Sequence, residues 1–158
     1  MNYTLKKSLG QHFLKDEKIS QRIVQAILDE NPQRLLEIGP GGGAITKYLI
    51  KQQNVDFKAY DVDGEKILYL QHIFPEHSDC FILQDILKAP LPFEGNFMVA
   101  GNFPYNISSQ ILFKIIEWKD YVPSVIGMFQ KEVADRVAAK EGSRTYGIIR
   151  DRKSTRLN

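Results

Sequence analysis

Hydrophobic residues along the chain fall into short runs that alternate with segments of helical spacing. Ile19, Ile23, Val24 and Ile27 recur at helical intervals after Asp16, which can cap that helix. Asn31-Pro32 ends it. The pattern then predicts strands over 35–38, 55–61, 80–83, 97–100 and within 122–129, and helices over 44–53, 64–74, 107–118 and 131–140.

Strands that alternate with helices predict an α/β fold, in which a doubly wound, mostly parallel sheet is covered on both faces. Ligands of such sheets bind beyond the carboxyl ends of the strands, where the strand order reverses. A glycine or polar residue follows each of the first four predicted strands: Gly39, Asp61, Asp85 and Asn102. We therefore expect one ligand site at this edge of the sheet.

Composition predicts one soluble globular domain of 158 residues, with 43% hydrophobic and 25% charged residues. No apolar run is long enough to span a membrane, and residues 1–14 lack the apolar core of a secretory signal. The single cysteine, Cys80, excludes an internal disulfide and is typical of a cytosolic protein. The formal charge is +2, but residues 150–158 contribute +3 and residues 1–149 therefore −1. Nucleic-acid affinity would have to come from local patches.

The glycine loop after the first strand fits two kinds of ligand. Gly39-x-Gly41-x-x-Ala44, with Asp61 placed 22 residues after Gly39, matches a dinucleotide fingerprint and allows a dehydrogenase. Glu37, however, places a carboxylate where an anionic pyrophosphate would lie. S-adenosylmethionine, whose ammonium and sulfonium groups are cationic, suits Glu37 better. Asp61 can then accept the ribose hydroxyls and Asp85 the adenine amine.

The stretch Asn102-Phe103-Pro104-Tyr105 has the groups needed to hold a planar base that carries an amino group. The Asn102 amide oxygen accepts N–H groups, Pro104 stiffens the turn, and the Tyr105 ring offers a stacking face. The alternative is an ordinary turn from strand to helix with Asn106 as the N-cap.

These motifs together resemble the ribosomal RNA adenine dimethyltransferases, and most closely those of the small subunit. The resemblance runs from about Lys6 to Ile148 and rests on the segments Gly10-Gln11-His12-Phe13-Leu14, Glu37-Ile38-Gly39-Pro40-Gly41 and Asn102–Ser108, and on Asp85. It implies a class I methyltransferase fold with S-adenosylmethionine as donor and no metal. The implied reaction dimethylates N6 of two adjacent adenines near the 3′ end of small-subunit rRNA, in a pre-ribosomal particle. A cytoplasmic monomer is implied as well.

The resemblance also assigns roles to residues. The implied donor-binding positions are His12, Leu14, Glu37, Gly39, Gly41, Asp61, Asp85 and Asn102. His12 and Leu14 would close over the donor, although His12 stands where many relatives have Asn. The implied catalytic positions are Asn102, Phe103, Pro104 and Tyr105. There the Asn102 oxygen and the Phe103 carbonyl would accept both N–H groups of the adenine amine, and Tyr105 would stack on the extruded base.

Two other functions share most of these motifs. One is a large-subunit rRNA adenine methylase of the macrolide-resistance type, and the other is a nucleic-acid-binding relative without catalysis. The family continues beyond residue 149 into further strands and a helical RNA-binding domain, whereas this chain ends in the basic stretch 150–158. We predict that this stretch lies outside the fold as a non-native tail, although a basic tail that grips RNA is the rival. We expect an exposed sheet edge and weak or absent activity of this chain by itself.

Overall fold

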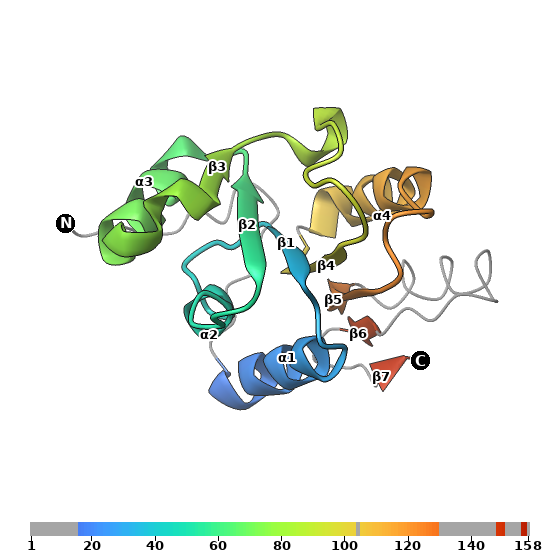
Figure 1. The fold of residues 1–158 in the computed structure, drawn as a ribbon, viewed down its shortest axis with the longest axis horizontal. Coiled ribbons are helices and arrows are strands. Elements are labelled where there is room, and N and C mark those ends of the chain that lie inside the picture. The colour runs from blue at the N-terminus through green and yellow to red at the C-terminus, as the bar shows by residue number, and fades with distance from the viewer. Residues whose placement is uncertain (1–15, 104, 130–147, 151–155, 158) are drawn as a thin grey trace.

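One twisted sheet forms the centre of the molecule in the computed structural model, which describes residues 16–103, 105–129, 148–150 and 156–157 (Figure 1). Its strand order is β3-β2-β1-β4-β5-β6-β7 within the described residues. All neighbouring strands pair in parallel except β6 and β7, which are antiparallel. The strands are β1 (Arg34–Ile38), β2 (Asp56–Asp61), β3 (Phe81–Leu83), β4 (Met98–Asn102), β5 (Val125–Phe129), β6 (Ile148–Arg150) and β7 (Arg156–Leu157).

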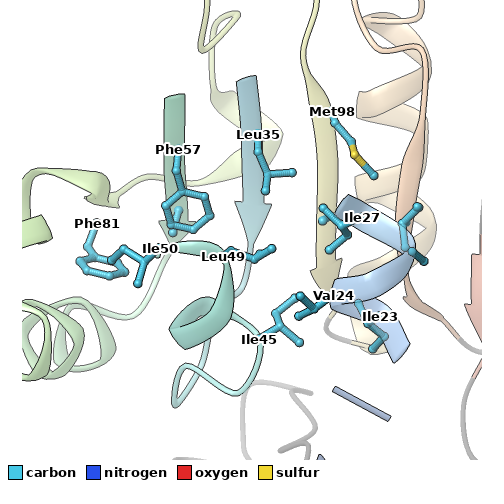
Figure 2. Packing of buried hydrophobic residues seen from close by; sticks show 14 of the residues in the cluster. Ile23, Val24, Ile27, Leu35, Ile45, Leu49, Ile50, Phe57, Phe81 and Met98 are labelled. Atoms are coloured by element: carbon cyan, nitrogen blue, oxygen red, sulfur yellow. The ribbon is translucent and has the colours of Figure 1, made fainter. Parts of the chain in front are cut away.

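Helices cover both faces of the sheet, which confirms the predicted doubly wound α/β fold. The α-helices are α1 (Glu17–Asp29), α2 (Thr46–Leu49), α3 (Gly64–Ile73) and α4 (Ser108–Glu117). Residues of α1, α2 and α3 pack on one face, and residues of α4 pack on the other (Figure 1). In the first of these cores, Ile23 and Ile27 of α1 and Leu49 of α2 meet Leu35 and Met98 of the strands (Figure 2).

The N-terminal helix forms as its sequence predicts. The Asp16 side chain accepts a hydrogen bond from the amide of Lys18 at 2.9 Å and so caps α1. Asn31, with a φ of 51°, turns the chain away after the helix. The buried positions Ile23, Val24 and Ile27 are those that helical spacing selected.

The structure differs from the predicted elements in one helix, in several unpredicted 3₁₀ helices and in the cap of α4. The helix expected over 44–53 is a single turn, α2, because the preceding loop takes left-handed backbone angles as far as Gly43 and β-branched residues flank the turn. Two 3₁₀ helices were not predicted, η2 (Pro75–Cys80) and η3 (Ile86–Lys88). Asn106 does not cap α4: it lies within a third, η4 (Tyr105–Ile107), and α4 begins after Ile107 without a side-chain cap.

The end of the chain also differs from the expectation. We predict that residues 150–158 lie outside the fold, but the structure places Arg150 in β6 and Arg156–Leu157 in β7. Strand β6 pairs with β5, and β7 forms the edge of the sheet among the described residues. Backbone groups at a sheet edge pair with any extended segment, and the alternation of side chains gives no signal for such pairing. The helix predicted over 131–140 lies outside the described residues.

The strand order reverses at β1. The chain runs from β1 to β2 and β3 on one side and then crosses to β4 on the other. Leu35–Ile38 consequently pair with residues of β2 on one side and of β4 on the other. This reversal places the expected ligand crevice between the chain segments that leave β1 and β4.

Strands β1 and β4 approach each other too closely for a side chain at Gly101. A Cβ atom at this position would lie 2.4 Å from the carbonyl oxygen of Ile38. That oxygen belongs to the backbone of the neighbouring strand, so it cannot move aside without disturbing the pairing. The spacing of the two strands therefore depends on glycine at residue 101.

We expect Gly101→Ala to lower the free energy of unfolding by about 1–3 kcal/mol, the usual cost of overpacking a tight interior. Gly64→Ala is the matched control, because a Cβ atom there meets nothing within 4 Å at the start of α3. It should be neutral or stabilise the protein by about 0.5–1 kcal/mol. Urea unfolding measures both; equal stability of the two variants would contradict the close approach.

Candidate donor and base site

Four neighbouring strands contribute residues to one edge of the sheet. Asp85 follows β3, Asp61 ends β2, Gly39 follows β1 and Asn102 ends β4. Because these strands are parallel and adjacent in the order β3-β2-β1-β4, their carboxyl ends lie side by side. The structure therefore brings together the four strand-end residues that the sequence selected.

The strand register also places Glu37, Asp61 and Asn102 on one face of the sheet. Glu37 pairs with Ala59 of β2 and with Ala100 of β4. Asp61 and Asn102 each lie two residues further along those strands, and side chains repeat their direction every second residue. Ala59 and Ala100 belong to the core under α1, α2 and α3. The three polar side chains thus lie towards these helices, with Glu37 one step deeper than the other two.

The glycine loop after β1 uses backbone angles that favour glycine. Gly39 has a φ of 69° and Gly41 a φ of 57°. The Gly39 amide donates to the carbonyl oxygen of Tyr60 at 2.8 Å, which ties the start of the loop to β2. A Cβ atom at Gly41 would meet no atom of the described residues within 4 Å. The part of the chain that the structure describes therefore leaves open space at Gly41.

Glu37 is a buried acid held by one hydroxyl group. Its side chain is 1% exposed, and Thr46 Oγ1 of α2 donates to Glu37 Oε1 at 2.6 Å. Burial raises the pKa of Glu37 to about 8; the Thr46 hydrogen bond opposes this rise, and the neighbouring charge of Asp61 adds to it. Glu37 therefore keeps its proton at neutral pH in this structure.

Asp61 is buried as well, and one of its oxygens is unsatisfied. Its Oδ1 atom accepts the Asp63 amide at 2.9 Å, whereas Oδ2 is buried and has no hydrogen-bond partner among the described residues. Burial raises the pKa of Asp61, and the backbone amide of Asp63, the ammonium of Lys66 and the amide of Gly41 oppose the rise. A buried carboxylate oxygen without a donor is costly. A ligand hydroxyl would remove that cost.

Sequence reasoning missed two buried residues close to these acids. Lys66 of α3 is 1% exposed; burial lowers its pKa, while Asp61 and Asp63 oppose that effect. Thr46 is fully buried beneath Glu37. Lys66 gave no signal, since lysines in the first turns of helices are usually solvated. The position of Thr46 directly after the glycine loop was a usable signal.

Asp85 and Phe103 have structural contacts in addition to their predicted roles. Asp85 Oδ1 accepts the amide of Leu87 at 2.9 Å and caps η3. Phe103 is fully buried in the core beneath α4, and its amide donates to the carbonyl oxygen of Met128 at 3.3 Å. The Phe103 ring therefore belongs to the core and leaves only its backbone for the predicted contact with the base. Asn102 is partly exposed, but its Oδ1 atom is shielded from solvent.

Four further positions were predicted for the site: His12, Leu14, Pro104 and Tyr105. His12, Leu14 and Pro104 lie outside the described residues. Tyr105 lies in η4, directly after the turn that follows β4. Their roles stay predictions.

Other features of the described residues do not suggest a competing site. No group of three or more His, Cys, Asp or Glu in the described part of the chain could hold a metal ion. None of the helices described is long and apolar enough to cross a membrane. An open groove lined by Asn31, Gln33, Arg34, Gln52 and Asp56 lies at the opposite edge, at the amino ends of the strands.

The sheet order and the site at its reversal define a Rossmann-like fold of the class I methyltransferase type, and comparisons with known proteins agree. A family profile described as ribosomal RNA adenine dimethylase matches residues 2–149. The ribosomal RNA small subunit methyltransferase A of Cytophaga hutchinsonii is 51% identical over 146 residues, which cover 90% of this chain and 57% of that protein. The protein of the same name from Parabacteroides distasonis is 48% identical, with 91% and 54% covered. This chain belongs to the ribosomal RNA adenine dimethylase family.

Solved structures show the same relationship. The 23S rRNA methyltransferase ErmE has a TM-score of 0.69 at 26% identity, over 83% of this chain and 53% of that one. A dimethyladenosine transferase from Plasmodium falciparum has a TM-score of 0.64 at 29% identity, over 79% and 46%. The chain spans only about half the length of the relatives that it matches. The expected fold class and family are confirmed.

The raised pKa of Glu37 predicts a pH-dependent stability. An unfolded Glu37 loses its proton near its ordinary value of 4.5, whereas the folded protein holds it up to about pH 8. Between these values the folded state binds more protons, so the free energy of unfolding should fall as the pH rises. Above pH 8 this contribution should not change further.

Glu37→Gln should reduce the decrease of the free energy of unfolding between pH 5 and 8. Urea unfolding at several pH values between 5 and 8 measures the slopes, and the exposed Glu76 provides the control variant Glu76→Gln, which should keep the wild-type slope. Asp61 and Lys66 remain in both variants, and Asp61, whose charge acts on Glu37, contributes to the difference through that coupling. Parallel slopes for Glu37→Gln and the wild type would show that Glu37 does not hold a proton in the fold.

Proposed function

We propose that the protein to which this chain belongs transfers methyl groups from S-adenosylmethionine to N6 of two adjacent adenines near the 3′ end of small-subunit rRNA. The observation that carries the proposal is the row of buried acids on neighbouring strands beside an open glycine loop. Membership of the ribosomal RNA adenine dimethylase family supports the reaction class. We further propose a monomer that acts on a pre-ribosomal particle in the cytoplasm.

The donor half of the site suits a cationic nucleoside. The unsatisfied Asp61 Oδ2 can accept a ribose hydroxyl, and Asp85 can accept the adenine amine. Glu37 provides a carboxylate for the ammonium group, and the space beside Gly41 admits the methionine portion. The bound donor would supply an electrophilic methyl group. A dinucleotide would bring its anionic pyrophosphate next to the same acids. This repulsion disfavours the dehydrogenase interpretation.

The acceptor half begins where β4 ends. Asn102 lies one strand away from the glycine loop, across the reversal in strand order. Its amide oxygen and the Phe103 carbonyl would accept the two N–H groups of the adenine amine. These contacts draw the nitrogen towards tetrahedral geometry and orient its lone pair, so catalysis rests on positioning.

The relatives favour a small-subunit target. Those at 41–51% identity carry the name ribosomal RNA small subunit methyltransferase A. The large-subunit enzyme ErmE shares the fold at 26% identity. Asn102 in the base segment favours an enzyme over a relative that only binds nucleic acid. Transfer of a radiolabelled methyl group to undermethylated small subunits, and to large subunits as the comparison, tests the choice.

Donor binding provides the first test. We expect S-adenosylhomocysteine to bind in calorimetry and NAD not to bind. Asp61→Ala should weaken binding by about 1–3 kcal/mol, because hydrogen bonds to a charged group are lost. Asp56→Ala is the matched control: Asp56 is exposed and begins the same strand, and its loss should leave the affinity unchanged. Tight binding of NAD without donor binding would restore the dehydrogenase interpretation.

A second substitution separates binding from chemistry. Asn102→Ala should leave the affinity for S-adenosylhomocysteine within a few fold and reduce methyl transfer by about 10²–10³-fold, as expected for a contact made in the transition state. Asn106→Ala, at an exposed position of η4, should retain activity. Methyl transfer to small subunits by the complete protein gives the readout. Full activity of Asn102→Ala would show that the segment after β4 is an ordinary turn without a role in catalysis.

A further inference from the structure

The contact between Thr46 and Glu37 joins the floor of the donor site to α2. Both residues are buried, at 0% and 1% exposed, and Thr46 Oγ1 lies 2.6 Å from Glu37 Oε1. The hydroxyl therefore holds one oxygen of the carboxyl group, Oε1, in place. Valine at residue 46 would fill nearly the same space without this hydrogen bond.

Among the described residues, the charged groups around Glu37 include no cation paired with it. From β2, Asp61 adds negative charge. From α3, Lys66 lies close enough to act on Asp61 and Asp63, but it makes no ion pair within 4 Å with a described acid. From β4, the residues opposite and beyond Glu37 are Ala100 and Asn102, which do not titrate. Lys47 of α2 is paired with Glu17 at 2.9 Å.

We propose that Thr46 is a positioning residue, which holds Glu37 so that its carboxyl group gives up a proton when the ammonium group of the donor binds beside it. This inference rests on the proposed donor site. The proton passes from the Glu37 carboxyl group to the solvent, the ammonium keeps its three protons, and no covalent bond changes. The ligand then supplies Glu37 with a paired positive charge, which no residue in the described part of the chain provides.

The electrostatics of the site support this exchange. Burial raises the pKa of Glu37 to about 8, so the empty site holds a proton at pH 6.5. A cation next to a buried carboxylate favours its charged form and lowers its pKa. Donor binding at pH 6.5 should therefore release up to one proton, in contrast to a ligand that occupies the same site without an ammonium group.

Titration calorimetry in buffers of different ionisation enthalpy measures the protons released. S-adenosylhomocysteine, which carries the ammonium group, should release about one proton at pH 6.5. Methylthioadenosine keeps the nucleoside but lacks the amino acid portion, and it should release markedly fewer. A proton released from Asp61 would be released on binding of either ligand. The difference in proton release between the two ligands is therefore assigned to Glu37. Glu37→Gln should abolish this difference.

The Thr46 variants test the positioning role. Thr46→Val should weaken the binding of S-adenosylhomocysteine by about 10–100-fold, as expected when a hydrogen bond to a charged group is lost. The affinity for methylthioadenosine should change by less than about threefold. Thr46→Ser keeps the hydroxyl group and should restore both the affinity for S-adenosylhomocysteine and the proton release. A structural defect would weaken the two ligands alike.

The outcomes separate the two proposals. Failure of both ligands to bind the wild-type chain would overturn the proposed donor site itself. Binding of S-adenosylhomocysteine with the same proton release as methylthioadenosine would overturn the exchange at Glu37. Equal losses for both ligands in Thr46→Val would overturn the positioning role. The Glu37→Gln and Thr46→Ser titrations decide the question even if Thr46→Val does not fold.

Discussion

Parallel pairing of β1 with both β2 and β4 is the constraint on which the site depends. It aligns the carboxyl ends of strands that come from distant parts of the sequence, and its register places Glu37, Asp61 and Asn102 on one face. The pairing with β4 requires glycine at residue 101, since any Cβ there would meet the β1 backbone. The close backbone approach of β4 to β1 at Gly101 therefore also places the residues proposed for the donor beside the segment proposed for the base.

The site is assembled at a cost to the fold. Glu37 and Asp61 are buried acids whose pKa values are raised by burial, and Lys66 is a buried base whose pKa is lowered by it. Each would be more stable in water, and the hydrophobic cores on both faces of the sheet offset the difference. A ligand that supplies hydroxyl groups and a positive charge satisfies these groups. The same interactions that recognise a donor then stabilise the folded protein by mass action.

The sequence allowed the sheet, its covering helices and the strand-end residues to be predicted, because those depend on hydrophobic periodicity and on the geometry common to parallel sheets. The short α2 could not be anticipated from Ile45 and Leu49, whose spacing fits a longer helix equally well. Nor could the burial of Lys66, which depends on how α3 packs over β2. The pairing of β6 and β7 is a property of backbone edges and has no side-chain signature. The roles predicted for Asp85 and Asn102 came from the hydrogen-bonding chemistry of their side chains at strand ends and from the family resemblance, and not from periodicity.

Most of the described residues proposed for the donor lie from Glu37 to Asp85, and Asn102, at the start of the base segment, is proposed for both donor and base. The proposed donor and base residues thus fall in consecutive blocks of the chain, which meet at the border between β1 and β4. Substitutions after Asn102 would leave the contacts proposed for Glu37, Asp61 and Asp85 unchanged. The proposal therefore implies a modular scaffold, in which the block before β4 serves one donor chemistry and the segment after Asn102 can diversify by exchange of a few residues.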